Sequence, residues 1–502
     1  DHPLAPDALS QAASAYSRVN KPREAVSRYQ QIIEKYPDYA RLERAYLNIV
    51  DVLRDASDDA EALRWTRQTQ EVFRGKLPEA LALFAQARIR IAQNDWQNAL
   101  ADLEKLLAFS DLGGTRVPGG TNKAEITFLK GFVLEQLGRF GEAIETYLSI
   151  PDGRNEYYGW RATERLRALA KNEKLKLFVE KAKIQFANEL SNSAPETQKK
   201  AAQNILRLTD EKEAQNKLLE TLRKTYAVLP AYQKVPSFNL LEFGRKEALK
   251  EKPETAGKNR HEILADELLF LGLYDEGTPE LEISLAENKS QRPKTEDLNY
   301  TLAVFYKRGD MAHRAVGFIE PLWRNVPSDY QIELISRDQA ELLYPAPYAD
   351  SLTKYAPERK LDPRYILSIM RQESRFRADV KSVAAARGLM QFISSTAGRI
   401  AKELGKENFQ QDELYHPPTA VLYGSQYLAN LFRQFPNQPE AVAASYNGGE
   451  TNMERWMARS KSIEADRYVP EIIFSQSKDY VYRVMANYRV YQMLYDENLK
   501  RK

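Results

Sequence analysis

The stretch Arg364–Gly388 reads RYILSIMRQESRFRADVKSVAAARG, and its first half has the pattern of a helix. Asp362 can cap this helix, and Pro363 suits the first helical position, where its missing N–H is of no consequence. Apolar residues then recur at helical spacing, at Ile366, Ile369 and Met370. The next position on the same face is Glu373. A carboxylate where the pattern calls for a core residue conflicts with the expected fold, and such conflicts tend to mark functional sites.

Two interpretations of Glu373 stay open from this helix alone. Burial against apolar side chains would raise the pKa of its carboxyl, which could then donate a proton near neutral pH and take one back later. Alternatively, the side chain turns to solvent or pairs with a nearby arginine, for which the candidates are Arg371, Arg375 and Arg377.

Composition limits the classes of protein that the chain can be. Its 502 residues are enough for several domains, and 43% hydrophobic and 28% charged residues are ordinary for a soluble protein. No apolar run approaches the ~20 residues of a membrane span. The chain has no cysteine and four scattered histidines, so we predict no disulfide, no metal site and no cofactor. Because it begins at Asp1 without a signal-peptide pattern, we expect a mature or trimmed form.

Charge is distributed unevenly along the chain. From Tyr344 onward there are 23 Lys and Arg against 18 Asp and Glu, a net charge of +5, whereas the preceding part has a net charge of −2. This difference is too mild to indicate nucleic-acid binding. It is compatible with a C-terminal part that meets an anionic polymer, or simply with a solvated surface of mixed charge.

Residues 1–340 are rich in helix formers and contain weak internal repeats. Small residues followed by bulky ones recur in several segments: Ala13, Tyr16, Ala25, Tyr29 and Pro37; Ala87, Asn94, Ala99, Leu103 and Leu106; Gly131, Gly138, Ala143 and Tyr147; Ala303, Tyr306, Ala315 and Pro327; and, more weakly, Ala265, Gly272 and Gly277. Small residues let paired helices approach closely, and each pair leaves an apolar face that must stack on the next pair. We therefore predict a curved array of helix pairs.

These repeats resemble tetratricopeptide helices, which implies a surface for protein partners or a scaffold; a plain spacer is the alternative. A part near residues 191–253 is less regular, and we expect loops at Gly113–Gly120 and Lys289–Lys294. At Tyr344–Tyr348 the chain reads YPAPY, where two prolines interrupt helical hydrogen bonding. The repeat pattern is lost beyond it. We predict two domains, residues 1–340 and 341–502.

The C-terminal part contains polar residues suited to a carbohydrate ligand. Gly388 permits a tight turn, and Gln391 offers two donors and an acceptor. An alanine-rich helix starting at Pro439 is expected to end at Gly448–Gly449, with Tyr446 near its end. Aromatic rings can pack on the apolar faces of sugars, and amides can bind their hydroxyls. For most of the 28 tyrosines, core packing is the simpler interpretation.

Five sequence features follow one another along the C-terminal part of the chain: RQES at Arg371–Ser374, Ser382, GLMQ at Gly388–Gln391, SYNGG at Ser445–Gly449, and EIIF at Glu471–Phe474 before Tyr480. Together they resemble the lytic transglycosylase domain of bacterial cell-wall enzymes. With the YPAPY junction and the helical array before it, the chain is similar to the soluble lytic transglycosylases. The resemblance implies an all-α fold, in which an α-superhelix curved into a ring or a horseshoe precedes a compact lysozyme-like domain.

The resemblance also implies an activity. The family cleaves the β-1,4 bond between N-acetylmuramic acid and N-acetylglucosamine in peptidoglycan without water, leaving a 1,6-anhydromuramic end. Glu373 would be the single catalytic acid and base, with the substrate's N-acetyl group stabilising the intermediate cation. The residues implied to bind substrate are Ser382, Gln391, Tyr446, Asn447, Glu471 and Tyr480. Ser374 and Met390 would support the site, with Ser374 orienting Glu373 or stabilising the loop.

Some positions depart from the family pattern. The family often has Gly at Ala385, Met at Ile393 and Ala at Ser445. Its Glu-Thr-Arg triplet before the last motif tyrosine is here Gln476-Ser477-Lys478, which puts a charge pair near the cleft in doubt.

Two other functions remain as alternatives. The first is hydrolysis, as in goose-type lysozymes, which would need a second carboxylate to activate water, with Asp412, Glu413 and Glu471 as candidates. The second is a non-catalytic helical scaffold. A peptidoglycan substrate implies a location in the periplasm or cell envelope. The partners expected are glycan strands and proteins on the superhelical part, with no nucleic acid and no membrane span.

Overall fold

The structure is a computed structural model that describes residues 2–191, 194–233, 237–241, 243, 259–287 and 295–502. Within these ranges the chain forms helices and a few isolated bridges, but no β-strand. The all-α prediction is therefore confirmed. In the same ranges, every helix is too short or too polar to cross a membrane.

The first seventeen α-helices form what we call the N-terminal arc (α1–α17). Their bounds are α1 Ala5–Arg18, α2 Pro22–Lys35, α3 Leu42–Asp55, α4 Asp59–Val72, α5 Leu77–Ala92, α6 Trp96–Leu106, α7 Lys123–Gln136, α8 Phe140–Leu148, α9 Tyr157–Lys171, α10 Lys176–Leu190, α11 Pro195–Leu208, α12 Lys212–Val228, α13 Arg260–Phe270, α14 Tyr274–Glu287, α15 Thr295–Arg308, α16 Ala312–Ile319 and α17 Arg337–Leu343. Consecutive helices pack against one another from α1 to α12 and from α13 to α17, as the repeats predict.

Small residues lie where the helices of a pair meet. Ala13 and Ala25 are fully buried between α1 and α2. Gly131 of α7 lies against Tyr147 of α8, and a Cβ atom at Gly131 would come within 2.6 Å of the tyrosine ring. The small-and-aromatic spacing of the sequence therefore has a direct physical cause, since a larger residue at Gly131 would separate the two helices.

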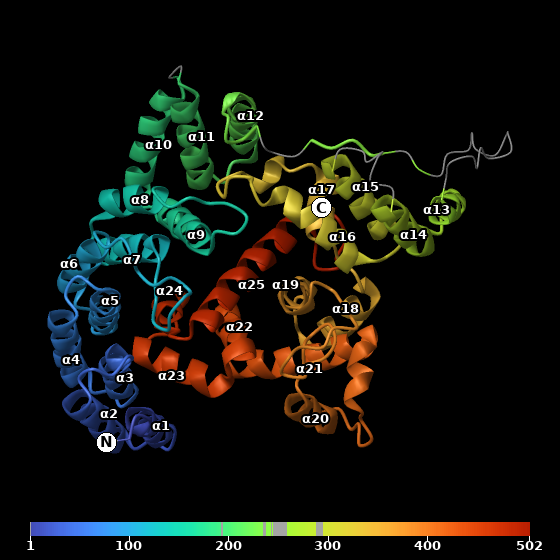
Figure 1. The fold of residues 1–502 in the computed structure, drawn as a ribbon. Coiled ribbons are helices and arrows are strands. Elements are labelled where there is room, and N and C mark those ends of the chain that lie inside the picture. The colour runs from blue at the N-terminus through green and yellow to red at the C-terminus, as the bar shows by residue number, and fades with distance from the viewer. Residues whose placement is uncertain (1, 192–193, 234–236, 242, 244–258, 288–294) are drawn as a thin grey trace.

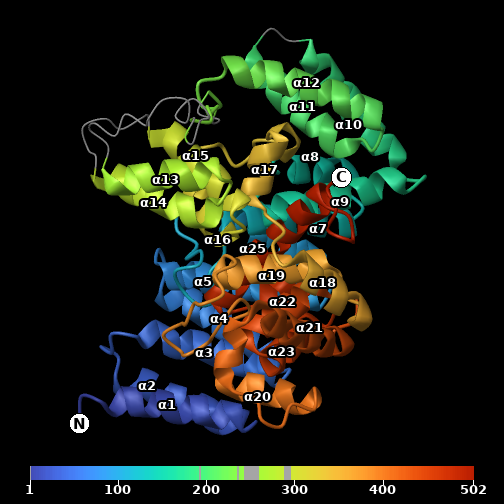
Figure 2. The same cartoon turned by 90° about the vertical axis from the view of Figure 1, so that its right-hand side faces the viewer.

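The arc curves around the remaining helices as an open horseshoe (Figures 1 and 2). Its two ends, α1 and α17, lie apart in both views, so the arc does not close into a ring by itself. The predicted loop at Gly113–Gly120 connects α6 to α7 as expected. The described portion of residues 191–253 contains α11 and α12, and the predicted loop at Lys289–Lys294 lies outside the described residues.

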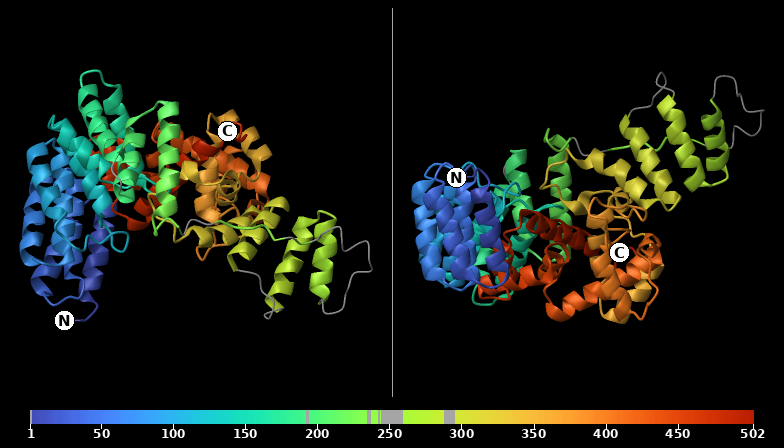
Figure 3. Two further views of the ribbon diagram at one scale, coloured as in Figure 1. Left: turned by 90° about the horizontal axis from the view of Figure 1, so that it is seen from above. Right: turned by 60° about the horizontal axis from the view of Figure 1, so that its bottom comes forward.

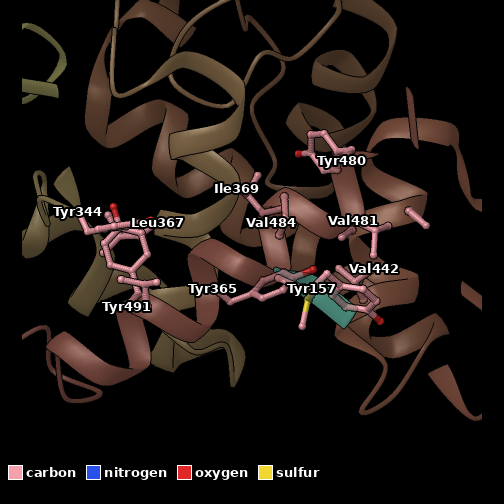
Figure 4. Packing of buried hydrophobic residues seen from close by; sticks show 14 of the residues in the cluster. Tyr157, Tyr344, Tyr365, Leu367, Ile369, Val442, Tyr480, Val481, Val484 and Tyr491 are labelled. Atoms are coloured by element: carbon pink, nitrogen blue, oxygen red, sulfur yellow. The ribbon is translucent and has the colours of Figure 1, made fainter. Parts of the chain in front are cut away.

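The remaining helices form the C-terminal part (α18–α25), which lies within the arc (Figure 3). Their bounds are α18 Ala349–Tyr355, α19 Pro363–Ser374, α20 Ser394–Glu403, α21 Pro417–Gln434, α22 Pro439–Gly448, α23 Glu450–Ser460, α24 Ala465–Tyr468 and α25 Ser475–Leu494. The long helix α25 packs on α19 and α22. Side chains such as Ile369, Val481 and Val484 fill this contact (Figure 4).

The C-terminal part also packs directly on the arc. Helix α23 contacts α3 and α5, and α25 contacts α9. One hydrophobic cluster of buried residues runs from Ala80 to Leu499 and so includes both parts. The YPAPY segment joins α17 to α18 without a helix of its own. The domain boundary between residues 340 and 341 stays a prediction.

Candidate active site

Helix α19 carries Glu373 close to its C-terminal end. The helix begins as predicted, with Pro363 in its first turn and the Asp362 carboxylate accepting a hydrogen bond from the Arg364 N–H at 2.9 Å. It ends abruptly because Arg375 and Phe376 both adopt left-handed backbone angles, with φ of 48° and 68°. The Phe376 side chain is buried and fixes this turn. Glu373 therefore sits at a well-defined helix end, one turn beyond the buried Met370.

The Glu373 carboxyl is half-buried and bonded to a tyrosine. Tyr480 of α25 donates a hydrogen bond to Glu373 Oε1 at 2.6 Å. Burial raises the pKa of Glu373 to about 7, while the hydrogen bond from Tyr480 opposes that rise. Such a carboxyl can both give and accept a proton near neutral pH.

The neighbouring arginines bind other carboxylates. Arg371 pairs with Glu320 at 2.7 Å and Arg375 lies 3.4 Å from the same residue, while Arg377 pairs with Asp379 at 2.8 Å. Of the two interpretations of Glu373, these contacts favour the buried acid.

Two parallel tyrosine rings stand beside Glu373. The rings of Tyr446 and Tyr480 lie 6.5 Å apart between centroids with an angle of 6° between their planes. Tyr446 donates a hydrogen bond to the Met390 carbonyl at 2.7 Å. Burial, and then the Glu373 charge, raise the pKa of both tyrosines well above its usual value. Both hydroxyls therefore stay protonated and act as donors.

The GLMQ turn is tied to the end of α19. Ser374 Oγ donates to the Leu389 carbonyl at 2.9 Å, so this side chain stabilises the loop. Gly388 has a φ of +74°, and a Cβ atom there would lie 1.9 Å from the Leu414 carbonyl oxygen. Gln391 Nε2 donates to the Gly388 carbonyl at 2.8 Å and closes the turn. Met390 is fully buried and packs against Gly424.

Two further predicted residues lie nearer the surface. Ser382 Oγ accepts a hydrogen bond from the Ala386 N–H at 3.1 Å, which shapes the exposed loop after α19. Asn447 is exposed at the end of α22, and its Oδ1 accepts a hydrogen bond from Ser477 Oγ at 2.8 Å. The helix ends at Gly448 as predicted, followed by Gly449 with a φ of +88°.

Glu471 requires a correction. The resemblance predicts that it binds substrate, but its side chain is 1% exposed and is held by two arginines of the arc. Arg54 donates to both of its oxygens and Arg88 donates at 3.0 Å. Burial alone would raise the pKa of Glu471, yet the arginines outweigh it and lower the pKa to about 2. Glu471 is thus an ion-pair residue of the interface, placed there by its partners on α3 and α5.

At Gln476-Ser477-Lys478, where the chain departs from the family's Glu-Thr-Arg triplet, the structure shows a contact that the sequence could not reveal. Lys478 is buried and its Nζ lies 3.0 Å from Oε1 of Glu125, on α7 of the arc. Lys478 thus forms a buried charge pair whose acid comes from the other part of the chain. No local pattern could indicate it, because the two residues lie 353 positions apart.

The candidates for a second catalytic carboxylate have structural partners. Asp412 pairs with Arg387, and Glu413 accepts a hydrogen bond from the Gln410 N–H in a capping box at 2.8 Å. Glu471 is enclosed by arginines as described. Across the described ranges, no group of three His, Asp or Glu side chains could hold a metal ion.

Two segments of the chain match models of known protein families. Residues 350–469 match the family model of the transglycosylase SLT domain, and residues 7–39 match that of the tetratricopeptide repeat. The second match covers the first predicted repeat and confirms it.

Among known proteins, the chain is 32% identical over 151 residues to a soluble lytic murein transglycosylase of Salmonella typhimurium, covering 30% of this chain and 23% of that protein. It is 30% identical to a putative soluble lytic murein transglycosylase of Haemophilus influenzae, covering 34% of this chain and 29% of that protein. The chain thus spans about a quarter of the length of these relatives.

Among solved structures, the 70 kDa soluble lytic transglycosylase of Escherichia coli matches with a TM-score of 0.38 and 17% identity, covering 100% of this chain and 88% of that one. The family-model and sequence matches confirm the resemblance that the motifs indicated, to the transglycosylase SLT domain over residues 350–469 and to the tetratricopeptide repeat over residues 7–39.

Proposed function

We propose, from the premise that residues 350–469 belong to the transglycosylase SLT domain family, that the chain is a peptidoglycan lytic transglycosylase. Its substrate would be the glycan strand, cleaved at the β-1,4 bond between N-acetylmuramic acid and N-acetylglucosamine. The observation that carries the proposal is the half-buried Glu373 carboxyl, whose pKa of about 7 suits an acid that must also act as a base.

The reaction needs one carboxyl group. Protonated Glu373 gives its proton to the glycosidic oxygen, and the bond between this oxygen and C1 of the muramoyl residue breaks. The resulting carboxylate then takes the proton of the muramoyl 6-hydroxyl while that oxygen bonds to C1. The proton returns to Glu373, no water is consumed, and the products are a free 4-hydroxyl and a 1,6-anhydro end.

The electrostatics of Glu373 support a single-carboxylate mechanism. A neighbouring carboxylate would raise its pKa further, but in the described part of the chain the rise comes from burial, and the hydrogen bond from Tyr480 opposes it. Asp412, Glu413 and Glu471 are engaged elsewhere. Hydrolysis by the mechanism of goose-type lysozymes is therefore less well supported. A non-catalytic scaffold would not need a carboxyl whose pKa is raised to about 7.

The other predicted site residues receive proposed roles as well. Tyr480 would orient the carboxyl, because its hydroxyl is bonded to Oε1. We propose that Ser382, Gln391, Tyr446 and Asn447 contact the sugars, and that Ser374 and Met390 keep the GLMQ turn in place. A peptidoglycan substrate would place the enzyme in the periplasm or cell envelope.

Product analysis tests the proposal. The chain is incubated with purified peptidoglycan, and soluble products are identified by mass spectrometry, with Glu373→Gln as the matched control. We expect 1,6-anhydromuramoyl products from the wild type and at least about a thousandfold less from the variant. Reducing-end muramic acid would establish a hydrolase instead, and equal activity of the variant would remove Glu373 from the mechanism.

A further inference from the structure

The segment that carries Tyr480 to Glu373 is held by the N-terminal arc at three points. Glu471 binds Arg54 and Arg88, and the Ile473 carbonyl accepts a hydrogen bond from the Gly119 N–H at 2.8 Å. The third contact is the ion pair between Lys478 and Glu125. Residues 471–480 therefore depend on the arc for their path.

The ion pair of Lys478 and Glu125 is enclosed and fully bonded. Lys478 is 4% exposed and Glu125 is 0% exposed. Lys478 Nζ lies 3.0 and 3.3 Å from the two Glu125 oxygens and also donates to the Pro470 carbonyl at 3.2 Å. Glu125 accepts two more hydrogen bonds, from Thr121 at 2.7 Å and Tyr158 at 2.9 Å. Because every partner is itself buried, the position of Lys478 is tightly fixed.

This fixed point lies next to the catalytic contact. Lys478 is in the first turn of α25, which begins at Ser475, and Tyr480 follows two residues later. At ~1.5 Å of rise per residue, the two Cα atoms differ by about 3 Å along the helix axis. A helix transmits a displacement of its first turn to the next residues almost unchanged. The hydroxyl of Tyr480 must reach Glu373 Oε1 within hydrogen-bond distance, so a small displacement would break the contact.

We infer that the Glu125–Lys478 ion pair is a positioning device, through which the N-terminal arc holds the Tyr480 hydroxyl on Glu373. This inference rests on the proposed role of Glu373 as the acid and base. It gives the arc a part in catalysis in addition to any role as a scaffold. Glu125 and Lys478 are positioning residues that act through Tyr480.

The inference has a specific signature in the titration of Glu373. The titratable groups that face its carboxyl are Tyr446 of α22 and Tyr480 of α25. The hydrogen bond from Tyr480 lowers the pKa of Glu373, against the effect of burial. If Tyr480 moves away, the pKa of Glu373 must rise. General loosening of the interface would let in water and lower it instead.

The experiment measures this pKa in the full chain by carbon-detected NMR of labelled glutamate, assigned by comparison with Glu373→Gln. Tyr480→Phe is expected to raise the pKa of Glu373 by about one unit, a tenfold change in its ionisation constant. Glu125→Gln is expected to produce most of the same rise. In the double variant with Tyr480→Phe, Glu125→Gln should add nothing, because both changes remove one hydrogen bond.

Two further variants keep the test decisive. Glu125→Gln with Lys478→Met removes both charges, so that no unpaired buried charge remains if the single variant folds poorly. It should show the same rise in pKa. Lys461→Met removes a different ion pair of the same interface, with Asp59 at 2.6 Å, and should leave the pKa and the activity unchanged.

The inference is overturned if Glu125→Gln leaves the pKa of Glu373 unchanged, lowers it, or still raises it when Tyr480 is phenylalanine. The upper limb of the pH profile of kcat/KM should move with the pKa. Failure of the proposed function looks different, since Glu373→Gln would then remain active whatever the titration of Glu373 shows in the other variants.

Discussion

Burial raises the pKa of Glu373 to about 7, and none of the nearby arginines offsets that rise. The three arginines near it in sequence bind Glu320 and Asp379. A guanidinium in contact would have lowered the pKa of the carboxyl and made it a poor acid at neutral pH. The contact with Tyr480 instead provides orientation while the carboxyl can still hold its proton.

Because its pKa is raised, replacing Glu373 with glutamine is expected to stabilise the folded chain by an amount that depends on pH. The pKa is raised in the folded state, so between about pH 4.5 and 7 the unfolded chain releases a proton that the folded chain retains. The stability of the wild type therefore falls as the pH rises through this window, whereas the glutamine variant has no proton to release.

We expect the two proteins to be equally stable at pH 4, and the variant to be more stable by up to about 3 kcal/mol at pH 8. Melting temperatures measured at both values check this. A constant difference across the range would mean that the carboxyl titrates normally in the folded protein.

At the scale of single residues, the sequence could identify Glu373 but not its contacts. Both signals are local in the sequence: Glu373 lies on the apolar face of a helix, and it is the acid of the RQES motif. The role of Glu471 could not be predicted, because Arg54 and Arg88 lie about 400 residues away and have no pattern that points to an acid. The same holds for Lys478 and Glu125.

At the scale of elements, the site depends on the close contact between the GLMQ turn and the segment before α21. Gly388 has a left-handed backbone conformation. A Cβ atom added to it would also lie only 1.9 Å from the Leu414 carbonyl oxygen. Either feature alone favours glycine, and together they leave no room for a side chain. The backbone carbonyls of this turn accept the hydrogen bonds that Ser374 and Tyr446 donate.

Gly388→Ala is therefore expected to destabilise the chain by at least about 3 kcal/mol and to reduce activity. Gly405→Ala is a matched control, since Gly405 also has a positive φ, of +68°, but has open space around it. That change should cost only about 1 kcal/mol. Urea unfolding and the rate of peptidoglycan solubilisation measure both effects. Equal losses for the two variants would show that backbone strain alone matters at Gly388.

The limits of α19 and α22 could be predicted from sequence because their signals are local. Asp362 with Pro363 marks one start, and Pro439 with Gly448–Gly449 marks both ends of the other helix. The curvature of the arc also follows from the repeats, since small residues such as Gly131 set how closely helices approach. The open horseshoe form does not follow from them, because it depends on how many small rotations between pairs accumulate.

At the scale of the whole molecule, buried ion pairs join the C-terminal part to the arc. Besides the pairs of Glu471 and Lys478, partly buried pairs join Arg459 to Asp51 and Asp55, and Arg489 to Asp152. Such pairs add little net stability compared with apolar packing, but they are specific, because each charge needs its own partner. They therefore fix one orientation of the C-terminal part within the arc.

Glu471→Gln tests this network and the correction made to that residue. Leaving Arg54 and Arg88 without their carboxylate should destabilise the chain by about 3 to 5 kcal/mol. Glu464→Gln at the same interface is the control, because Glu464 is 41% exposed and its loss should cost no more than about 1 kcal/mol. Differential scanning calorimetry compares the two.

The stabilisation from Glu471 should also depend on pH. Its pKa is lowered in the folded state, so its contribution is present above about pH 4.5 and is lost as the pH falls toward 2. A variant that is as stable as the wild type at pH 7, but binds glycan strands more weakly, would restore Glu471 as a substrate-binding residue.

The ion pair of Glu125 and Lys478 also constrains how proteins of this kind can diverge. Because a buried charge without its partner is unfavourable, we expect the loss of the charge at one of these positions in a relative to be accompanied by a change at the other. Two positions 353 residues apart would then change together, as residues in contact do. A chimera that joins the arc of one relative to the catalytic part of another will close its interface only when these two positions match.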